Sequence, residues 1–155
     1  GMTRRIMIST ALVEKPKLVI ADEPTPGLDP KLAKRAMEHF RQLADMGAAV
    51  LVITHDLELA LETVDRVQVF YAGHTIEDAS VDDFEREETL RHPYTRALWR
   101  AMPKHGFHYI GGVQPYVKDN LQGCPFAPRC DMASRECQGE IPWKVSGSGY
   151  VRCIL

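Results

Sequence analysis

The sequence has no apolar run that approaches the roughly 20 residues needed to cross a bilayer. It also lacks an excess of charge of one sign, with a formal net charge of -2, so nucleic acid and anionic membranes are not favoured partners. No cysteine occurs in the first 123 residues, which argues against a secreted disulfide scaffold. The beginning of the sequence is basic but has no apolar core of the kind that a cleavable signal requires.

A Gly-Lys pair is absent from the whole sequence. The loop that cradles nucleotide phosphates needs that pair, because its backbone amides and its lysine hold the phosphate oxygens. We therefore expect this chain, taken alone, to hydrolyse no ATP.

Two strands that the sequence predicts to be buried nevertheless end in polar side chains suited to phosphoryl transfer. The run 18–21 has no polar alternation, which predicts a parallel strand buried on both faces, and Asp22 and Glu23 follow it. The run 49–53 predicts a second such strand and leads into His55. Because parallel strands bring their carboxyl ends to one edge of a sheet, these side chains are candidates for a nucleotide site.

Capping residues and prolines divide the rest of the sequence into short elements. Asp29 and Asp56 are each predicted to begin a helix, and Gly47 is predicted to end the first of them. The expected helices cover 3–13, 30–46, 57–64, a short segment after Ser80, and 93 to Pro103; the expected strands after residue 53 are 66–71 and 74–79. Beyond residue 103 no strong periodicity remains, which predicts a module boundary near residue 104.

All four cysteines, Cys124, Cys130, Cys137 and Cys153, lie in the last fifth of the chain. This grouping is typical of a metal or cluster site, and the spacing is neither that of a zinc ribbon nor that of a ferredoxin. The spacing alone leaves the kind of metal open. Arg129, beside Cys130, is interpreted either as a surface arginine or as a cation close to the thiolates.

The order of these motifs resembles the ATP-binding subunit of ABC transporters. Residues 17–25 resemble its Walker B strand, 27–29 its D-loop and 54–56 its switch histidine, while 1–5 match the tail of its signature motif. Residues 92–98 (HPYTRAL) and 123–130 (GCPFAPRC) are similar to the C-terminal extension of oligopeptide/dipeptide and nickel importer ATPases. The resemblance therefore covers the C-terminal half of such a subunit, without the Walker A loop.

The resemblance implies a role for each candidate residue. Asp22 would serve Mg2+, Glu23 would polarise the attacking water and His55 would contact the terminal phosphate of ATP. Asp29 would lie in the D-loop at the interface with a second ATPase domain, and Gly1 would be the signature glycine. The four cysteines would bind an iron–sulfur cluster of the 4Fe–4S type, with Zn2+ as the alternative.

The fold implied by the resemblance is α/β. It comprises part of a P-loop NTPase parallel sheet with flanking helices (1–80), a helical connector (81–103) and an irregular, Cys-rich extension (104–155). The intact subunit would hydrolyse ATP at the cytoplasmic face of the membrane to import oligopeptides, dipeptides or similar solutes.

Its expected partners are a second ABC ATPase domain, the transmembrane permease subunits and, indirectly, an extracytoplasmic solute-binding protein. The competing hypothesis is a non-catalytic, iron–sulfur or zinc-binding regulatory module with a vestigial ATPase half.

Overall fold

The computed structural model describes residues 16–116 and 122–155, and it has mixed α/β structure. The chain divides into two compact units, residues 1–64 and 65–155, and each is described by itself. The helix predicted over residues 3–13 lies outside the described residues. No helix in the described part of the chain is long and apolar enough to cross a membrane.

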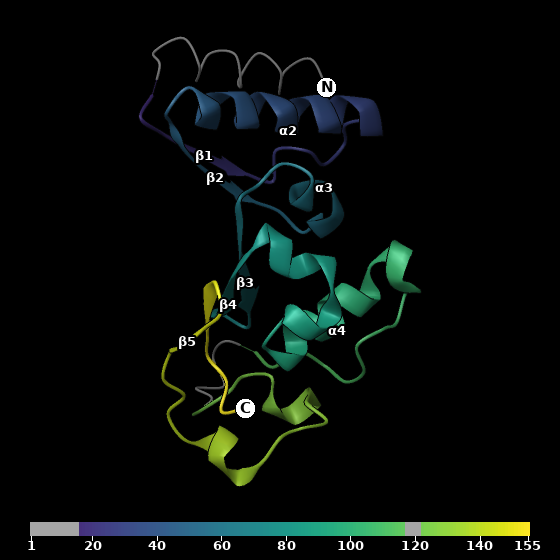
Figure 1. Cartoon of the computed structure of the whole chain (residues 1–155). Helices are drawn as coiled ribbons and strands as arrows, with labels where there is room; N and C mark the ends of the chain where they lie inside the picture. Colours follow the sequence, from purple (N-terminus) through teal and green to yellow (C-terminus); the bar gives the residue numbers. More distant parts are fainter. Residues whose placement is uncertain (1–15, 117–121) are drawn as a thin grey trace. The chain divides into compact units, whose positions relative to one another are not determined.

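The first unit is built on two parallel strands and one long helix. Strand β1 (Leu18–Asp22) pairs in parallel with β2 (Ala49–Ile53), and the two predicted strands are confirmed. Helix α2 (Pro30–Asp45) connects them and lies along one face of the pair (Figure 1). A strand, a crossover helix and a parallel strand form the βαβ arrangement that the sequence predicts.

Helix α2 packs its apolar face on this strand pair. Val19 of β1 forms a core cluster with Met37, Phe40 and Leu43 of α2, and these four side chains are 1% to 9% exposed. Alternate residues of both strands, such as Ala21, lie against the cluster. One face of the two-stranded sheet is therefore buried.

The opposite face of the same strand pair is bare. Leu18, Ile20, Leu51 and Ile53 are 48% to 60% exposed. The prediction that β1 is buried on both faces is thus wrong for this chain. The reason is geometric, because alternate side chains of a strand point to opposite faces and α2 covers only one of them.

The two helices that the structure describes in the first unit begin at the predicted aspartates. Asp29 Oδ1 accepts hydrogen bonds of 3.1 Å from the backbone N–H groups of Lys31 and Leu32 at the start of α2. Asp56 caps α3 (Leu57–Leu61) through the Leu59 N–H, at 3.0 Å. Helix α3 ends earlier than the predicted residue 64, which agrees with the low helix propensity of the β-branched pair at 63–64.

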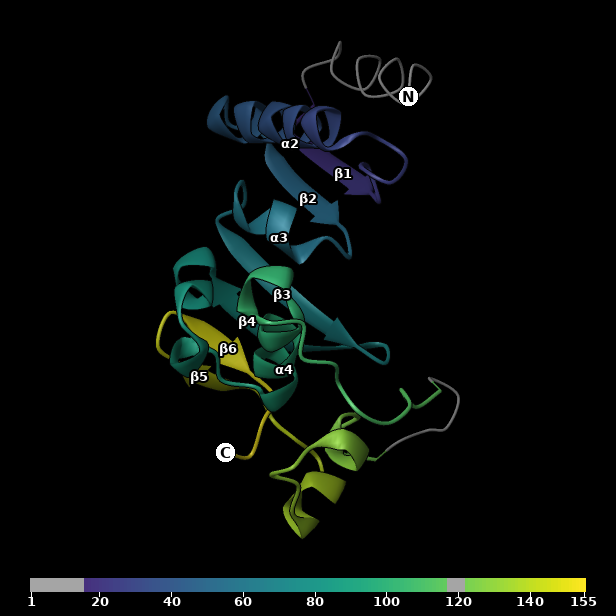
Figure 2. The same ribbon diagram turned by 90° about the vertical axis from the view of Figure 1, so that its right-hand side faces the viewer.

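The second unit contains a four-stranded antiparallel sheet in the order β3-β4-β6-β5. The hairpin of β3 (Arg66–Tyr71) and β4 (His74–Ser80) was predicted. Strands β5 (Lys144–Ser146) and β6 (Gly149–Val151) were not, and β6 pairs with β4 (Figure 2). The expectation of a wholly irregular tail is therefore wrong at residues 144–151.

Gly149 shows why this pairing demands a particular residue. A Cβ atom at this position would lie 2.0 Å from the carbonyl oxygen of Asp78, on the neighbouring strand β4. Only glycine permits so close an approach of the two backbones. The Gly-Ser-Gly segment at 147–149 therefore serves the sheet as well as the turn.

Short helical segments complete the second unit. Ser80 caps η1 (Val81–Glu85) as predicted, and His92 caps α4 (Pro93–Ala101), where its Nδ1 accepts a hydrogen bond from the Tyr94 N–H. The remaining segments are single turns: η2 (Glu87–Thr89), η3 (Pro103–His105), η5 (Ala127–Arg129) and η6 (Arg135–Gln138).

Candidate nucleotide site

The ends of β1 and β2 bring the two polar tips of the first unit together. The parallel register sets Asp22 opposite Ile53, and the Glu23 N–H donates a 2.9 Å hydrogen bond to the Ile53 carbonyl oxygen. Glu23 has a φ of 44°, a region that residues other than glycine rarely adopt. Strained positions of this kind cluster at functional sites, where the surrounding structure holds them in place.

Glu23 and His55 are in direct contact although 32 positions separate them. Glu23 Oε1 lies 2.9 Å from His55 Nδ1. The hydrogen bond to Glu23, followed by its negative charge, raises the pKa of His55 above its ordinary value, against a small opposing effect of burial. The structure therefore brings together two side chains that the sequence assigned to one site.

The two carboxylate oxygens of Glu23 differ in their hydrogen bonding. Glu23 Oε2 is buried and accepts no hydrogen bond from any residue in the described ranges. An unsatisfied carboxylate oxygen is costly to bury, so a hydrogen-bond donor supplied by a ligand would stabilise it. Glu23 thus has one oxygen that is paired with His55 and one that has no hydrogen-bond partner among the described residues.

Asp22 and Asp29 have separate surroundings. Asp22 is exposed at the same strand end as Glu23, where its carboxylate could act as an oxygen ligand of a divalent cation. Asp29 is committed to the cap of α2. Its D-loop role stays a prediction, as do the other assigned roles, and Gly1 lies outside the described residues.

A cavity of about 510 Å3 lies beside His55 in the first unit. Thr25, Gly27, Lys34 and Glu62 are among the residues that line it. Lys34 Nζ forms a 2.6 Å ion pair with Glu62 Oε2 at this cavity. The cavity therefore joins the segment predicted to be the D-loop to the predicted switch histidine.

The four cysteines form no comparable group. All are free thiols, and the described part of the chain contains no cluster of three or more His, Cys, Asp or Glu that could hold a metal ion. Burial raises the pKa of the Cys124 and Cys130 thiols. These positions do not fit an iron–sulfur cluster or zinc, which require several thiolates on one centre.

Sequence reasoning missed a buried polar network in the second unit. Glu77 is fully buried, and its two oxygens accept hydrogen bonds from the backbone N–H groups of Arg91 (3.0 Å) and His92 (2.9 Å). The His92 ring is also buried, and its Nε2 lies 3.8 Å from Cys124 Sγ. No clear signal is present in the sequence, because Glu77 lies in a largely polar strand (HTIEDAS), where a glutamate does not stand out.

Arg129 has a structural role that neither sequence interpretation anticipated. Its guanidinium donates to the carbonyl oxygens of Gly111 (2.7 Å) and Ile110 (2.8 Å) and to the Tyr71 hydroxyl (3.0 Å). It also lies 5.9 Å from the centroids of the Tyr71 and Phe126 rings. Arg129 thus fastens the 110–111 segment to the sheet.

Comparison with known proteins shows which proteins this chain resembles. Residues 76–137 match the family described as "Oligopeptide/dipeptide transporter, C-terminal region". Over nearly its whole length the chain is also similar to ATP-binding proteins of peptide ABC transporters. The chain is therefore similar to a part of these ATP-binding proteins, and that part includes their C-terminal region.

Three relatives define the similarity. The probable peptide ABC transporter ATP-binding protein y4tR of Sinorhizobium fredii is 43% identical over 149 residues, which is 92% of this chain and 44% of the relative. The dipeptide transport ATP-binding protein DppD of Haemophilus influenzae is 39% identical (99% and 48%), and the oligopeptide transport ATP-binding protein AppD of Bacillus subtilis is 40% identical (100% and 49%). The chain thus spans about half the length of the curated relatives that it matches.

Proposed function

We propose that this chain supplies the Walker B, D-loop and switch-histidine half of the ATPase site in a peptide-importer subunit. The observation that carries the proposal is the 2.9 Å contact between Glu23 and His55 at the ends of two adjacent parallel strands. The names of the relatives support ATP binding and peptide transport as the context. The non-catalytic alternative is less favoured, because its working part would be a metal site, and residues 16–116 and 122–155 contain no group of three or more metal-binding side chains.

In this proposal Glu23 acts on the attacking water and His55 acts on the phosphate. When His55 Nδ1–H donates to Glu23 Oε1, the free Oε2 is the oxygen that orients an attacking water and accepts its proton. The raised pKa of His55 favours the cation, whose Nε2–H donates to a phosphate oxygen. The second nitrogen of His55 therefore stabilises charge that develops on the phosphate.

Asp22 fits the remaining requirement of phosphoryl transfer. Mg2+ in nucleotide sites is held by one or two carboxylates and by the phosphates, and the exposed Asp22 at the strand end is the carboxylate that would hold it. When bound, Mg2+ neutralises negative charge on the phosphate oxygens. Asp29 caps α2 and thereby sets the position of the loop before it, which is the segment that would face a second ATPase domain.

The proposal also divides the chain by function. Residues 1–80 are assigned to the ATPase part, 81–103 to a connector and 104–155 to the transporter-type extension. The β3–β4 hairpin is then shared, because it ends the ATPase part and pairs with β6 of the extension. The intact subunit would act with a second ATPase domain, permease subunits and a solute-binding protein at the cytoplasmic membrane face.

A chimera tests the proposal. The part of Haemophilus influenzae DppD that this chain does not match would be fused ahead of it, and Mg2+-dependent ATP hydrolysis would be measured. We expect hydrolysis by the chimera and none by the chain alone. Glu23→Gln should lower kcat by about 10²- to 10⁴-fold, the usual contribution of a general base, and leave ATP binding intact.

Glu38→Gln is the matched control, because Glu38 is an exposed carboxylate on α2 outside the proposed site. It should hydrolyse ATP at the rate of the unmodified chimera. An unchanged kcat in Glu23→Gln, in a chimera that binds and hydrolyses ATP, would contradict the proposed role of Glu23.

A further inference from the structure

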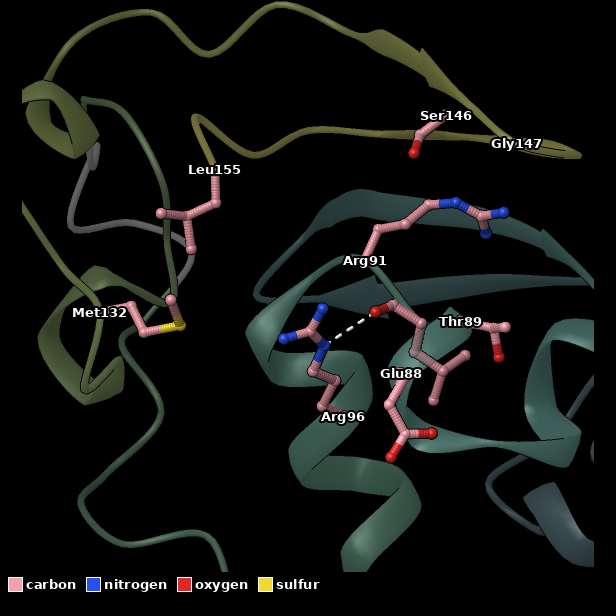
Figure 3. A pocket seen from close by; sticks show the side chains of 9 residues that line it. Glu88, Thr89, Arg91, Arg96, Met132, Ser146, Gly147 and Leu155 are labelled. Carbon is pink, nitrogen blue, oxygen red and sulfur yellow. Dashed lines mark hydrogen bonds between the residues drawn. The ribbon is translucent and has the colours of Figure 1, made fainter.

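The second unit contains a pocket of about 440 Å3 that the proposed ATPase chemistry does not use. Figure 3 shows the side chains around it, which come from the η2–α4 region and from the tail. Its apolar wall includes Met132 and Leu155, and its polar lining includes Arg91, Arg96 and Ser146. The volume lies within the range of pockets that bind small organic ligands.

One of the two arginines is already compensated within the protein. Arg91 Nη1 lies 2.9 Å from Asp83 Oδ2 and 3.5 Å from Glu77 Oε1. Two carboxylates thus surround this guanidinium, and Arg91 is mostly buried. Arg91 therefore contributes little uncompensated charge to the pocket.

Arg96 differs because, among the described residues, only its Nε has a hydrogen-bond partner. Its Nε donates a 2.8 Å hydrogen bond to the carbonyl oxygen of Leu90, a residue that is 0% exposed. Within residues 16–116 and 122–155, no acceptor bonds either terminal nitrogen of Arg96, and Met132 and Leu155 line the same pocket (Figure 3). The hydrogen bond at Nε therefore fixes the half-buried guanidinium group of Arg96. The N–H groups of its two terminal nitrogens have no acceptor among the described residues.

A free guanidinium fork beside an apolar wall selects a particular kind of ligand. Its two parallel N–H groups match the two oxygens of a carboxylate, and a bidentate pair of this kind is among the stronger polar interactions in proteins. A doubly charged phosphate suits the pocket less well, because Arg91 is neutralised and Glu88 adds a negative charge to the lining. The apolar wall favours a hydrocarbon group next to the carboxylate.

We propose that this pocket binds the terminal carboxylate of a short peptide whose last side chain is apolar. The carboxylate pairs with the terminal nitrogens of Arg96, and the apolar side chain packs on Met132 and Leu155. The Ser146 hydroxyl is available to the peptide backbone. The site is independent of Glu23 and His55, because all its lining residues belong to the second unit.

Calorimetry on the full chain tests this proposal with acetyl-Ala-Ala-Leu and with the same tripeptide as a C-terminal amide. We expect saturable binding of the acid with a Kd on the order of 1 mM, and binding of the amide at least about tenfold weaker. Equal affinity for acid and amide, or no saturable binding of the acid, would overturn the proposal. Inorganic phosphate is the competing anion, and displacement of the acid by an equal concentration of phosphate would show a general anion site and overturn the proposal as well.

Substitutions at Arg96 locate the site. Arg96→Gln should weaken binding of the acid at least about tenfold, and Arg96→Lys should weaken it less, because lysine keeps the charge but loses the fork. Arg100→Gln is the matched control and should bind as the unmodified chain does, because Arg100 lies on the same helix outside the pocket and pairs with Glu87. An unchanged affinity in Arg96→Gln would refute the assignment.

A second substitution covers the case in which Arg96→Gln fails to fold, as thermal melting by circular dichroism would show. Met132 is 51% exposed, so Met132→Glu is compatible with folding and adds a negative charge to the wall of the pocket. It should weaken binding of the acid at least about tenfold, whereas Met132→Gln should weaken it less. Equal affinities for these two variants would contradict the proposed position of the carboxylate.

Discussion

The two units of the chain each contain a histidine whose pKa is shifted, and the shifts have opposite signs. His55 in the first unit has a side chain that is 79% exposed, and its contact with Glu23 raises its pKa. His92 in the second unit is 1% exposed, and burial lowers its pKa to about 4. The first histidine is thus set up to meet a ligand, whereas the second is a neutral part of the folded structure.

The same contrast extends to the packing of the units. In the first unit α2 covers one face of the β1–β2 sheet and leaves apolar side chains exposed on the other. In the second unit the buried side chains include charged and polar groups, Glu77, His92 and Thr95. The candidate catalytic residues therefore lie on the unit with the incomplete core, and the buried polar network of Glu77 and His92 lies in the second unit.

The largest expected effect is the loss of the buried carboxylate in the second unit. Glu77→Ala removes the acceptor of two backbone N–H groups and leaves Arg91 with one carboxylate fewer, which should destabilise the unit by about 3–5 kcal/mol. Urea unfolding followed by tryptophan fluorescence measures this, because both tryptophans, Trp99 and Trp143, lie in the second unit.

The control for that experiment is Glu85→Ala, at an exposed position of η1. It should change the unfolding free energy by no more than about 0.5 kcal/mol. Similar losses for the two variants would mean that the Glu77 network does not stabilise the second unit.

The next largest effect is a loss of stability of the second unit at acid pH, caused by His92. The pKa of His92 in the folded state, about 4, lies below its unfolded value near 6.5, so the unfolded chain binds the proton more readily between these values. The contribution of His92 to stability is therefore complete above pH 6.5 and is lost as the pH falls to 4, by about 3 kcal/mol. The His92 ring accepts a hydrogen bond from the Tyr94 N–H at Nδ1 and lies near Cys124 at Nε2, and the His92 backbone N–H donates to Glu77.

Urea midpoints between pH 7 and pH 4 measure this slope, again by tryptophan fluorescence. His92→Gln should flatten the slope, because glutamine can still accept the hydrogen bond from Tyr94 but takes up no proton in this range. An equal slope in both proteins would rule out His92 as the origin of the acid sensitivity.

The smallest effect is expected on the bare face of the first unit. Ile20 is 60% exposed and Val19, its neighbour in β1, is 9% exposed. In this chain Ile20→Ser should change stability by no more than about 0.5 kcal/mol, whereas Val19→Ala should cost about 1–2 kcal/mol. Hydrogen exchange of the β1 and β2 amides compares the two variants.

The DppD chimera provides a second setting in which the effect of Ile20→Ser on stability can be measured. If the remaining length of the relatives packs on the bare face, Ile20→Ser should cost about 2 kcal/mol or more in the chimera, because the side chain is then buried. An equally small effect in the chain and in the chimera would indicate that this face stays open.

Local signals in the sequence predicted much of this structure. Asp29, Asp56 and Ser80 begin helical segments as predicted, and both core strands lie where the apolar runs are. These features depend on neighbours within a few residues, which a sequence displays directly. The convergence of Glu23 and His55 was also predictable, because two parallel strands must end at the same edge.

Features that depend on distant contacts were not predictable. The β5–β6 hairpin has strands of three residues, too short for a period to be recognised. Arg129 acts on carbonyl groups 18 and 19 positions away, and nothing in the neighbouring residues indicates this. The expectation that β1 is buried on both faces assumed a sheet with more layers than the described residues provide.

The most direct test of the account is the pKa of His55, measured by NMR titration in the unmodified chain and in Glu23→Gln. If the carboxylate contacts the ring, the unmodified chain should show a pKa above 6.5, and Glu23→Gln should bring it back towards that value. The same pKa in both proteins would mean that Glu23 and His55 do not meet, and the proposed ATPase half-site would lose its basis.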